Sequence, residues 1–109
     1  MTGRREGEVQ AGIIGYLGMR GIWFWRNNSG VFSPRPGAFI RAGTKGMPDL
    51  LAVLPPNGRL VGIEVKREIG GRLSPAQKAW GEELTRHGGL FIVATSVQDV
   101  IDALPKGAP

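Results

Sequence analysis

The sequence contains no cysteine and only one histidine, and these shortages remove several kinds of chemistry. Without cysteine there can be no disulfide bridge, thiolate metal site or cysteine nucleophile. The single histidine, His87, is expected at a helix end, where a favourable interaction with the helix dipole accounts for it. A mechanism built on histidine is therefore disfavoured, and the lack of cysteine is compatible with a reducing cytoplasm.

Long apolar runs are also missing. No run approaches the roughly 20 residues that a membrane-spanning helix needs, and the N-terminus lacks the hydrophobic region of a signal peptide. A chain of 109 residues is long enough for one hydrophobic core and too short for two. We expect a single domain over residues 1–109, with a core at about 4–104 and a short C-terminal tail, in the cytoplasm and without a membrane partner.

Acidic residues are absent between Glu8 and Asp49, although the same interval contains several basic ones. The whole chain has 14 Lys and Arg against 9 Asp and Glu, a formal net charge of +5. This balance favours an anionic partner such as nucleic acid, and a solvated basic surface is the alternative. The candidate DNA-binding residues are Arg26, Asn27, Arg35, Arg41, Lys45, Arg67 and Arg72.

Residues 47–66 predict a β-hairpin, because two apolar runs flank a Pro-Pro-Asn-Gly turn at 55–58. If the hairpin closes symmetrically around that turn, Asp49 lies directly opposite Glu64. Side chains alternate along a strand, so Lys66 shares the face of Glu64. The hairpin would therefore gather two carboxylates and one amine.

Directly opposed carboxylates repel one another, and a sheet selected only for stability would avoid them. A hard divalent cation bound between the two carboxylates would make their proximity favourable, and carboxylate oxygens suit Mg²⁺ or Mn²⁺. One alternative is that Asp49 caps a turn while Glu64 and Lys66 are ordinary exposed strand residues. Another is a register slip of one residue, which would move Asp49 to the other face.

The spacing of apolar residues predicts a first helix over residues 4–19. Glu8, Gly12 and Gly15 form a line at the edge of its apolar face, and the interior glycines indicate a close packing neighbour. Glu8 is therefore expected at the border of the core. Glu6 is better explained as a first-turn glutamate favoured by the helix dipole.

A short strand is expected at residues 22–26, with Trp23 and Trp25 on one face. These two indoles could stack on bases, but we favour a contact in the core or with a second copy. Residues 31–46 have the least regular pattern, which predicts a long loop with a short strand at 38–42.

The last third of the chain predicts helix, strand and helix. Ser74, Pro75 and Gln77 form a capping box, which accounts for Gln77 on structural grounds. The apolar run at 90–94 predicts a buried strand, and Ser96 begins a short helix. The order of elements predicts an α/β fold with a mixed sheet.

Five short segments follow one another along the chain: Glu-Val-Gln at 8–10, Trp-Arg-Asn-Asn at 25–28, Gly-Met-Pro-Asp-Leu at 46–50, Gly-Ile-Glu-Val-Lys at 62–66 and Leu-Ser-Pro-Ala-Gln at 73–77. Taken together and in this order, they resemble the VRR-NUC family of virus-type replication and repair nucleases in the PD-(D/E)XK superfamily. The likeness extends from about Glu8 to Thr95, and the chain is similar to the stand-alone phage or bacterial members of the family. It implies an αβββαβ restriction-endonuclease-like core.

This resemblance implies Mg²⁺- or Mn²⁺-dependent hydrolysis of DNA phosphodiester bonds. Asp49 and Glu64 would bind the metal together with the backbone carbonyl of Val65. Glu8 would be a further acidic ligand, either directly or through water.

The resemblance also assigns roles to two polar side chains near the metal. Lys66 would orient or help deprotonate the attacking water, and Gln77 would help place that lysine or the water. Similar stand-alone nucleases are homodimers that act on four-way (Holliday) junctions, which would place this protein in DNA repair. The competing hypotheses are a non-catalytic basic DNA-binding module and an assembly protein whose tryptophans form an interface.

Overall fold

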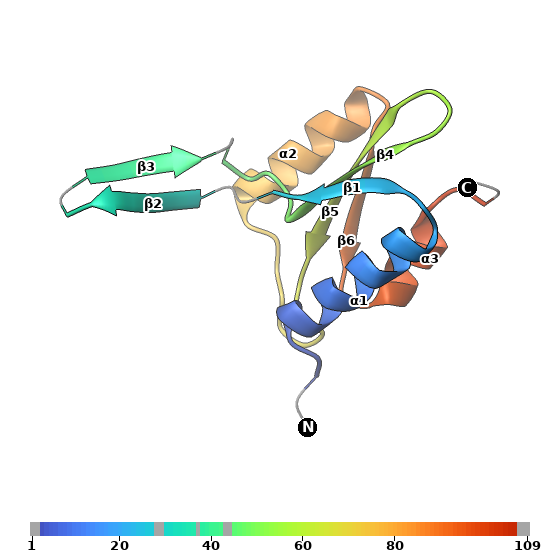
Figure 1. The fold of residues 1–109 in the computed structure, drawn as a ribbon, viewed down its shortest axis with the longest axis horizontal. Coiled ribbons are helices and arrows are strands. Elements are labelled where there is room, and N and C mark those ends of the chain that lie inside the picture. Colours follow the sequence, from blue (N-terminus) through green and yellow to red (C-terminus); the bar gives the residue numbers. More distant parts are fainter. Residues whose placement is uncertain (1–2, 28–29, 37, 43–44, 107–109) are drawn as a thin grey trace.

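The computed structural model describes residues 3–27, 30–36, 38–42 and 45–106, with the backbone alone described for 30–34 and 38–42. Four strands form one sheet in the order β1-β4-β5-β6, and β2 and β3 form a separate pair (Figure 1). The elements are α1 (Glu6–Met19), β1 (Trp23–Arg26), β2 (Gly30–Arg35), β3 (Ala38–Ala42), β4 (Leu50–Leu54), β5 (Arg59–Val65), α2 (Pro75–Arg86), β6 (Leu90–Ala94) and α3 (Val97–Ala103).

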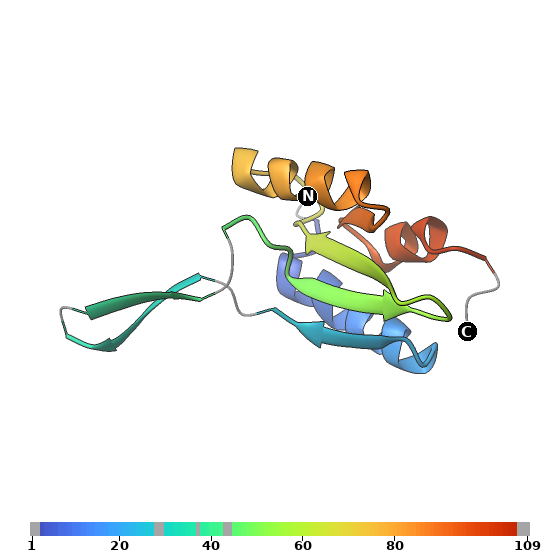
Figure 2. The same cartoon turned by 90° about the horizontal axis from the view of Figure 1, so that it is seen from above.

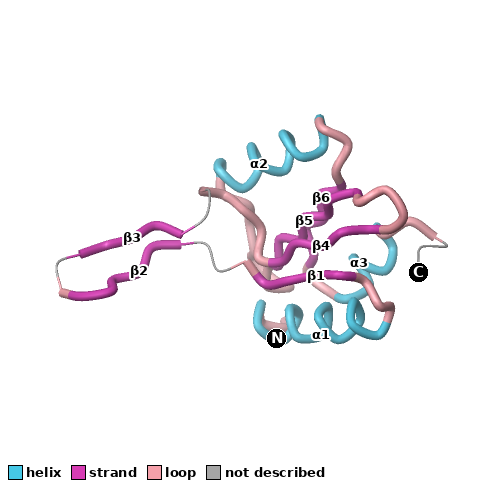
Figure 3. The backbone as a smooth tube through the Cα atoms, turned by 45° about the horizontal axis from the view of Figure 1, so that its top comes forward, coloured by secondary structure: helices cyan, strands magenta, loops and turns pink. Residues whose placement is uncertain are grey.

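The four-stranded sheet lies between two helical layers. Helices α1 and α3 cover one face and α2 covers part of the other (Figure 3). Strands β1, β4 and β5 are antiparallel neighbours, whereas β5 and β6 run parallel, so the predicted α/β fold with a mixed sheet is confirmed. No helix in the described part of the chain is long and apolar enough to cross a membrane.

The hairpin predicted at 47–66 is formed by β4 and β5. Leu54 pairs with Arg59 across the turn and Leu50 pairs with Ile63, which is the symmetric register expected from the sequence. Gly58 closes the turn with a φ of +75°, a conformation that glycine adopts without steric cost. Asp49 directly precedes β4. The next position beyond the Leu50–Ile63 pair therefore has Asp49 on one strand and Glu64 on the other.

The hydrophobic core lies between the sheet and the α1–α3 layer. Val9, Ile13 and Leu17 form the buried face of α1, at the spacing of a helix that covers a sheet. A Cβ added to Gly12 would lie 2.6 Å from Val97 Cγ2, so the close neighbour expected for this glycine is helix α3. No described atom lies within 4 Å of a Cβ added to Gly15.

Helix α2 begins and ends as predicted. The Ser74 hydroxyl accepts a hydrogen bond from the Gln77 N–H at 3.1 Å, and the Gln77 side chain accepts one from the Ser74 N–H at 2.8 Å. Pro75 occupies the first turn, and His87 is the C-terminal cap. Gly88 then leaves the helix with a φ of +91°. This cap places Gln77 in the first turn of the helix that covers β5.

Strand β2 forms where the sequence predicts a loop, whereas β3 forms at the predicted residues 38–42. The two strands pair antiparallel, with an irregular register between Phe32 and Arg35. Figures 1 and 2 show this hairpin projecting away from the sheet and its helices. A strand that does not lie against a core need not show the alternating apolar pattern on which strand prediction relies.

Candidate functional site

The predicted pair of carboxylates meets at the ends of β4 and β5. Asp49 is held by the backbone of the neighbouring strand, because its Oδ2 accepts a hydrogen bond from the Val65 N–H at 2.8 Å. Glu64 is 2% exposed, and no other charged or polar side chain belongs to the described core. The alternative in which Glu64 is an ordinary exposed strand residue is therefore wrong.

The two oxygens of Glu64 have different surroundings. Oε1 accepts a hydrogen bond from Gln77 Nε2 at 2.9 Å and lies 3.6 Å from Lys66 Nζ. Oε2 is buried and has no hydrogen-bond partner among the described residues. Buried polar atoms are rarely left without a partner, because the lost hydration costs about 1–3 kcal/mol. Oε2 of Glu64 therefore has an acceptor position that no described residue fills and that a water or a cation could fill.

The charge of Glu64 responds to this environment. Burial and, to a smaller extent, the nearby Asp49 carboxylate together raise the pKa of Glu64 to about 7, while Lys66 opposes both effects. In the ligand-free site, Glu64 therefore holds its proton to a higher pH than an ordinary glutamate does. A cation bound between the two carboxylates would displace this proton and satisfy both groups.

Gln77 combines two roles that the sequence suggested separately. Its backbone N–H and side-chain oxygen complete the cap with Ser74, and its side-chain nitrogen donates to Glu64 Oε1. The cap therefore orients the amide group that holds one oxygen of the buried carboxylate. This contact requires α2 to pack over β5, which the spacing of residues does not reveal.

Asn27 was predicted to contact DNA, and the structure places it against the segment that carries Asp49. Its backbone N–H donates to the Asp49 carbonyl at 2.8 Å, and its side-chain nitrogen donates to the Pro48 carbonyl at 3.2 Å. These contacts fasten the end of β1 to the start of β4. Sequence reasoning missed this role of Asn27, because it depends on the pairing of β1 with β4 and these strands are distant in sequence.

The turn before Pro48 packs closely against α2. Gly46 has a φ of +88°, and a Cβ added to it would collide with the backbone carbonyl of Ala76. Pro48 itself is buried and lies under Gly62. Gly46 therefore has a packing function in the turn before Pro48.

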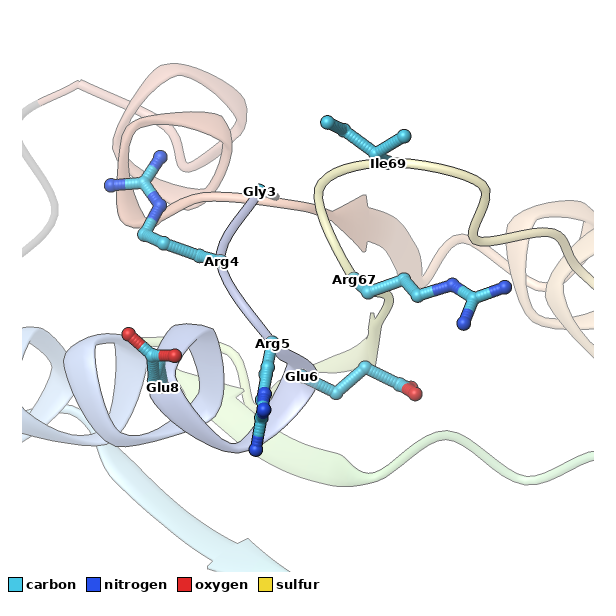
Figure 4. A pocket seen from close by; sticks show the side chains of 7 residues that line it. All are labelled: Gly3, Arg4, Arg5, Glu6, Glu8, Arg67 and Ile69. Carbon is cyan, nitrogen blue, oxygen red and sulfur yellow. The ribbon is translucent and has the colours of Figure 1, made fainter. Parts of the chain in front are cut away.

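Glu8 does not join the carboxylate pair. It is exposed, so the prediction that it lies at the border of the core is wrong. Figure 4 shows Glu6 and Arg67 extending toward the same side, while Glu8 points the other way. Helical periodicity explains the difference, since Glu6 lies one turn before the buried Val9 and Glu8 does not. Within the described ranges, no three His, Asp or Glu side chains gather as metal ligands.

The predicted DNA-binding residues lie in several parts of the structure. Arg67 directly follows Lys66 and lines a cavity of about 900 Å³ at the start of α1 (Figure 4). The side chain of Arg41 lies outside those that the structure describes. The remaining charged candidates, Arg26, Arg35, Lys45 and Arg72, are exposed.

The tryptophans of β1 are not core residues. Trp23 is 70% exposed and Trp25 is 39% exposed, so the expected contact in the core is wrong, while a contact with a second copy stays a prediction. Their rings contact one another in a tilted arrangement with centroids 5.5 Å apart. The face of the sheet at β1 is therefore open.

Comparisons with known proteins agree with this geometry. The family model of the VRR-NUC domain matches residues 37–98, a range that includes Asp49, Glu64, Lys66 and Gln77. A solved structure described as a VRR_NUC domain is similar with a TM-score of 0.65 and 26% sequence identity. That likeness covers 91% of this chain and 92% of the other. Among curated proteins, no match was found.

Proposed function

Because the chain belongs to the VRR-NUC domain family and so has a nuclease-type function, we propose that it is a Mg²⁺- or Mn²⁺-dependent endonuclease that hydrolyses DNA phosphodiester bonds. One observation carries the metal dependence: the buried Glu64 carboxylate lies beside Asp49 with one oxygen unpartnered in the described structure. A fold that needed only stability would not keep two carboxylates together with one of them dehydrated.

The residues at the site fit a hard divalent cation. Asp49, Glu64 and the backbone carbonyl of Val65 would hold it, and all three supply the oxygen ligands that Mg²⁺ and Mn²⁺ prefer. When bound, such an ion supplies Lewis-acid chemistry, polarising the phosphate and activating a water.

Two side chains of this protein act beside the metal ligands. Lys66 is only 15% exposed and lies 3.6 Å from Glu64 Oε1, so its ammonium group is held at the edge of the site. It orients the attacking water and offsets negative charge on the phosphate. Gln77 engages Glu64 Oε1 and keeps that carboxylate in one orientation, which makes it a positioning residue.

We propose Glu6 in place of Glu8 as the candidate for a further acidic residue near the site. Its side chain extends to the side of Arg67, which follows Lys66 in the chain (Figure 4). The two glutamates provide a matched test, since both are exposed and both lie in the first turn of α1. Glu6→Gln should lower cleavage about tenfold or more and Glu8→Gln should change it less than about twofold. The reverse order would restore Glu8 to the site.

Branched DNA is the proposed substrate and a homodimer the proposed active form. The resemblance to stand-alone junction-cutting nucleases supports both proposals, and the net charge of +5 supports DNA as the partner. In a symmetric dimer, two sites would cut two strands of a four-way junction, as a repair resolvase does. Symmetric nicks by a dimer support this assignment, and cleavage by a monodisperse monomer contradicts it.

The function is tested with wild-type protein and Asp49→Asn on labelled four-way junction, flap and linear duplex. Each is incubated with Mg²⁺, Mn²⁺ or chelator. We expect cleavage that requires metal and is lost in the variant, while binding of the DNA is retained. Tight binding without cleavage under any metal would instead support the non-catalytic DNA-binding module.

A further inference from the structure

Strand β1 places Trp25 on the face of the sheet that carries the two carboxylates. Trp25 pairs with Leu51 on β4, and Leu51 pairs with Gly62 on β5. Paired residues point to the same face, and every second residue along a strand returns to it. Asp49 is two residues from Leu51, and Glu64 is two residues from Gly62. The indole and the carboxylate pair therefore share one face.

Helix α2 covers the opposite half of this face. A Cβ added to Gly62 would lie 2.9 Å from Trp80 and 3.3 Å from Leu84, so α2 packs directly over β5. Figures 1 and 3 show α2 on the β5–β6 side, with β1 at the other edge of the sheet. This arrangement leaves Trp23 and Trp25 open to solvent at 70% and 39% exposure.

Trp25 is also close to the place where a phosphate would be cut. The Asn27 N–H donates to the Asp49 carbonyl at 2.8 Å, so the pairing of β1 with β4 continues to this point. Trp25 is then the diagonal neighbour of Asp49, and such neighbours lie about 7–8 Å apart. Nucleotides in a stacked strand are spaced by about 3.4 Å, so this separation corresponds to about two nucleotides.

The charge around the two indoles suits a nucleic acid. No acidic residue occurs in the sequence between Glu8 and Asp49, so no carboxylate from this interval opposes a phosphate at the indoles. The exposed Arg26 follows Trp25 in the edge strand β1, on the alternate face. Proteins that hold single-stranded DNA combine basic side chains with exposed aromatic rings on which bases stack. An interface between copies of this chain would bring the same basic residues together, which makes a second copy the weaker choice of occupant.

From these observations we infer that Trp25 and Trp23 form a stacking platform for unpaired bases of the DNA strand held at the Asp49–Glu64 site. The inference rests on the proposed endonuclease function and names the structural feature that its substrate must have. Bases within a continuous duplex are stacked on one another and are not available to an indole. The platform therefore favours flaps, single strands and junctions whose branch-point bases are unpaired over linear duplex.

The test is performed in chelator, so that binding is separated from cleavage. Single-stranded oligonucleotide and duplex of equal length are titrated while tryptophan fluorescence and affinity are measured for wild type, Trp25→Leu, Trp25→Phe and Trp23→Leu. Trp80 contributes equally to all of these proteins. We expect single strands to quench wild-type fluorescence and Trp25→Leu to weaken their binding by roughly fivefold or more. Trp25→Phe should retain most of the affinity, and duplex binding should change less than about twofold.

Other outcomes separate this inference from the function on which it rests. If wild type cleaves DNA but is not quenched by single strands, and Trp25→Leu binds them unchanged, the platform is overturned and the nuclease stands. If Trp25→Leu only converts a dimer to a monomer, the face is an interface between copies. If Trp25→Leu does not fold, quenching of wild type and the affinity of Trp23→Leu decide the matter.

Discussion

The β4–β5 hairpin and the β2–β3 hairpin have the same local topology, yet one positions chemistry and the other projects from the body of the protein. In β4–β5 most residues are buried, because this hairpin is the centre of a sheet with helices on both faces. An isolated two-stranded hairpin is marginally stable in water at best. Burial on both faces is what locks a register tightly enough to bring Asp49 beside Glu64.

The largest expected effect concerns the cost of keeping Glu64 dehydrated. The pKa of about 7 in the folded protein lies above the ordinary value of 4.5, so the folded state binds this proton more tightly. The stabilisation that the folded state gains from binding this proton is fully present below about pH 4.5 and is lost as the pH rises through about 7. That contribution is on the order of 3 kcal/mol in the metal-free protein.

Denaturant unfolding of wild type and Glu64→Gln at pH 5 and pH 8, in chelator, measures this contribution. Wild type should lose stability relative to Glu64→Gln between the two pH values. Added Mg²⁺ should raise the melting temperature of wild type more at pH 8 than at pH 5, since binding must displace the Glu64 proton at low pH. An equal metal effect at both values would contradict the assignment.

Gly62 tests how tightly the central hairpin is packed. A Cβ at this position would lie 2.9 Å from Trp80 and 3.0 Å from Pro48, so Gly62→Val should destabilise the protein by about 1–3 kcal/mol. The displaced Pro48 would move Asp49, and metal-dependent cleavage should fall even in protein that remains folded. Gly58→Asn, in the exposed turn of the same hairpin, is the matched control and should keep nearly full cleavage.

Asn27 tests the link between β1 and the site. Asn27→Ala removes the hydrogen bond to the Pro48 carbonyl, and we expect a loss of about 1 kcal/mol in unfolding free energy with a severalfold decrease in cleavage. Arg26→Ala is the control, because Arg26 is exposed and precedes the contact. It should weaken DNA binding without changing stability. Equal effects of the two variants on stability would contradict a positioning role for Asn27.

The smallest effect on stability is expected from the projecting hairpin. Replacing residues 31–41 with two glycines should change the free energy of unfolding by less than about 1 kcal/mol, because this hairpin does not contribute to the described core. The replacement removes Arg35 and Arg41. If both arginines contact phosphates, the slope of log DNA affinity against log salt concentration should decrease in magnitude by about two. Unfolding of the shortened protein would show that the hairpin supports the fold.

Sequence reasoning succeeded where the signal was local or repeated. The alternation of apolar residues and the Pro-Pro-Asn-Gly turn predicted the register that sets Asp49 near Glu64. The capping box predicted the first turn of α2. Sequence reasoning failed for Glu8, because residue spacing does not show which edge of a helix's apolar face lies near the site. It failed for β2, because this strand lies apart from the core.

The sequence by itself determined the α/β class, the central hairpin and the chemical character of the site, because these depend on residue type and on periods of two or 3.6. Only the tertiary structure decided that Glu64 is buried with one oxygen unpartnered in the described chain. It also decided that Asn27 holds the segment of Asp49 and that the tryptophans face solvent. Burial, pKa and hydrogen-bond partners arise from elements that are distant in the chain, and folding alone brings those elements together.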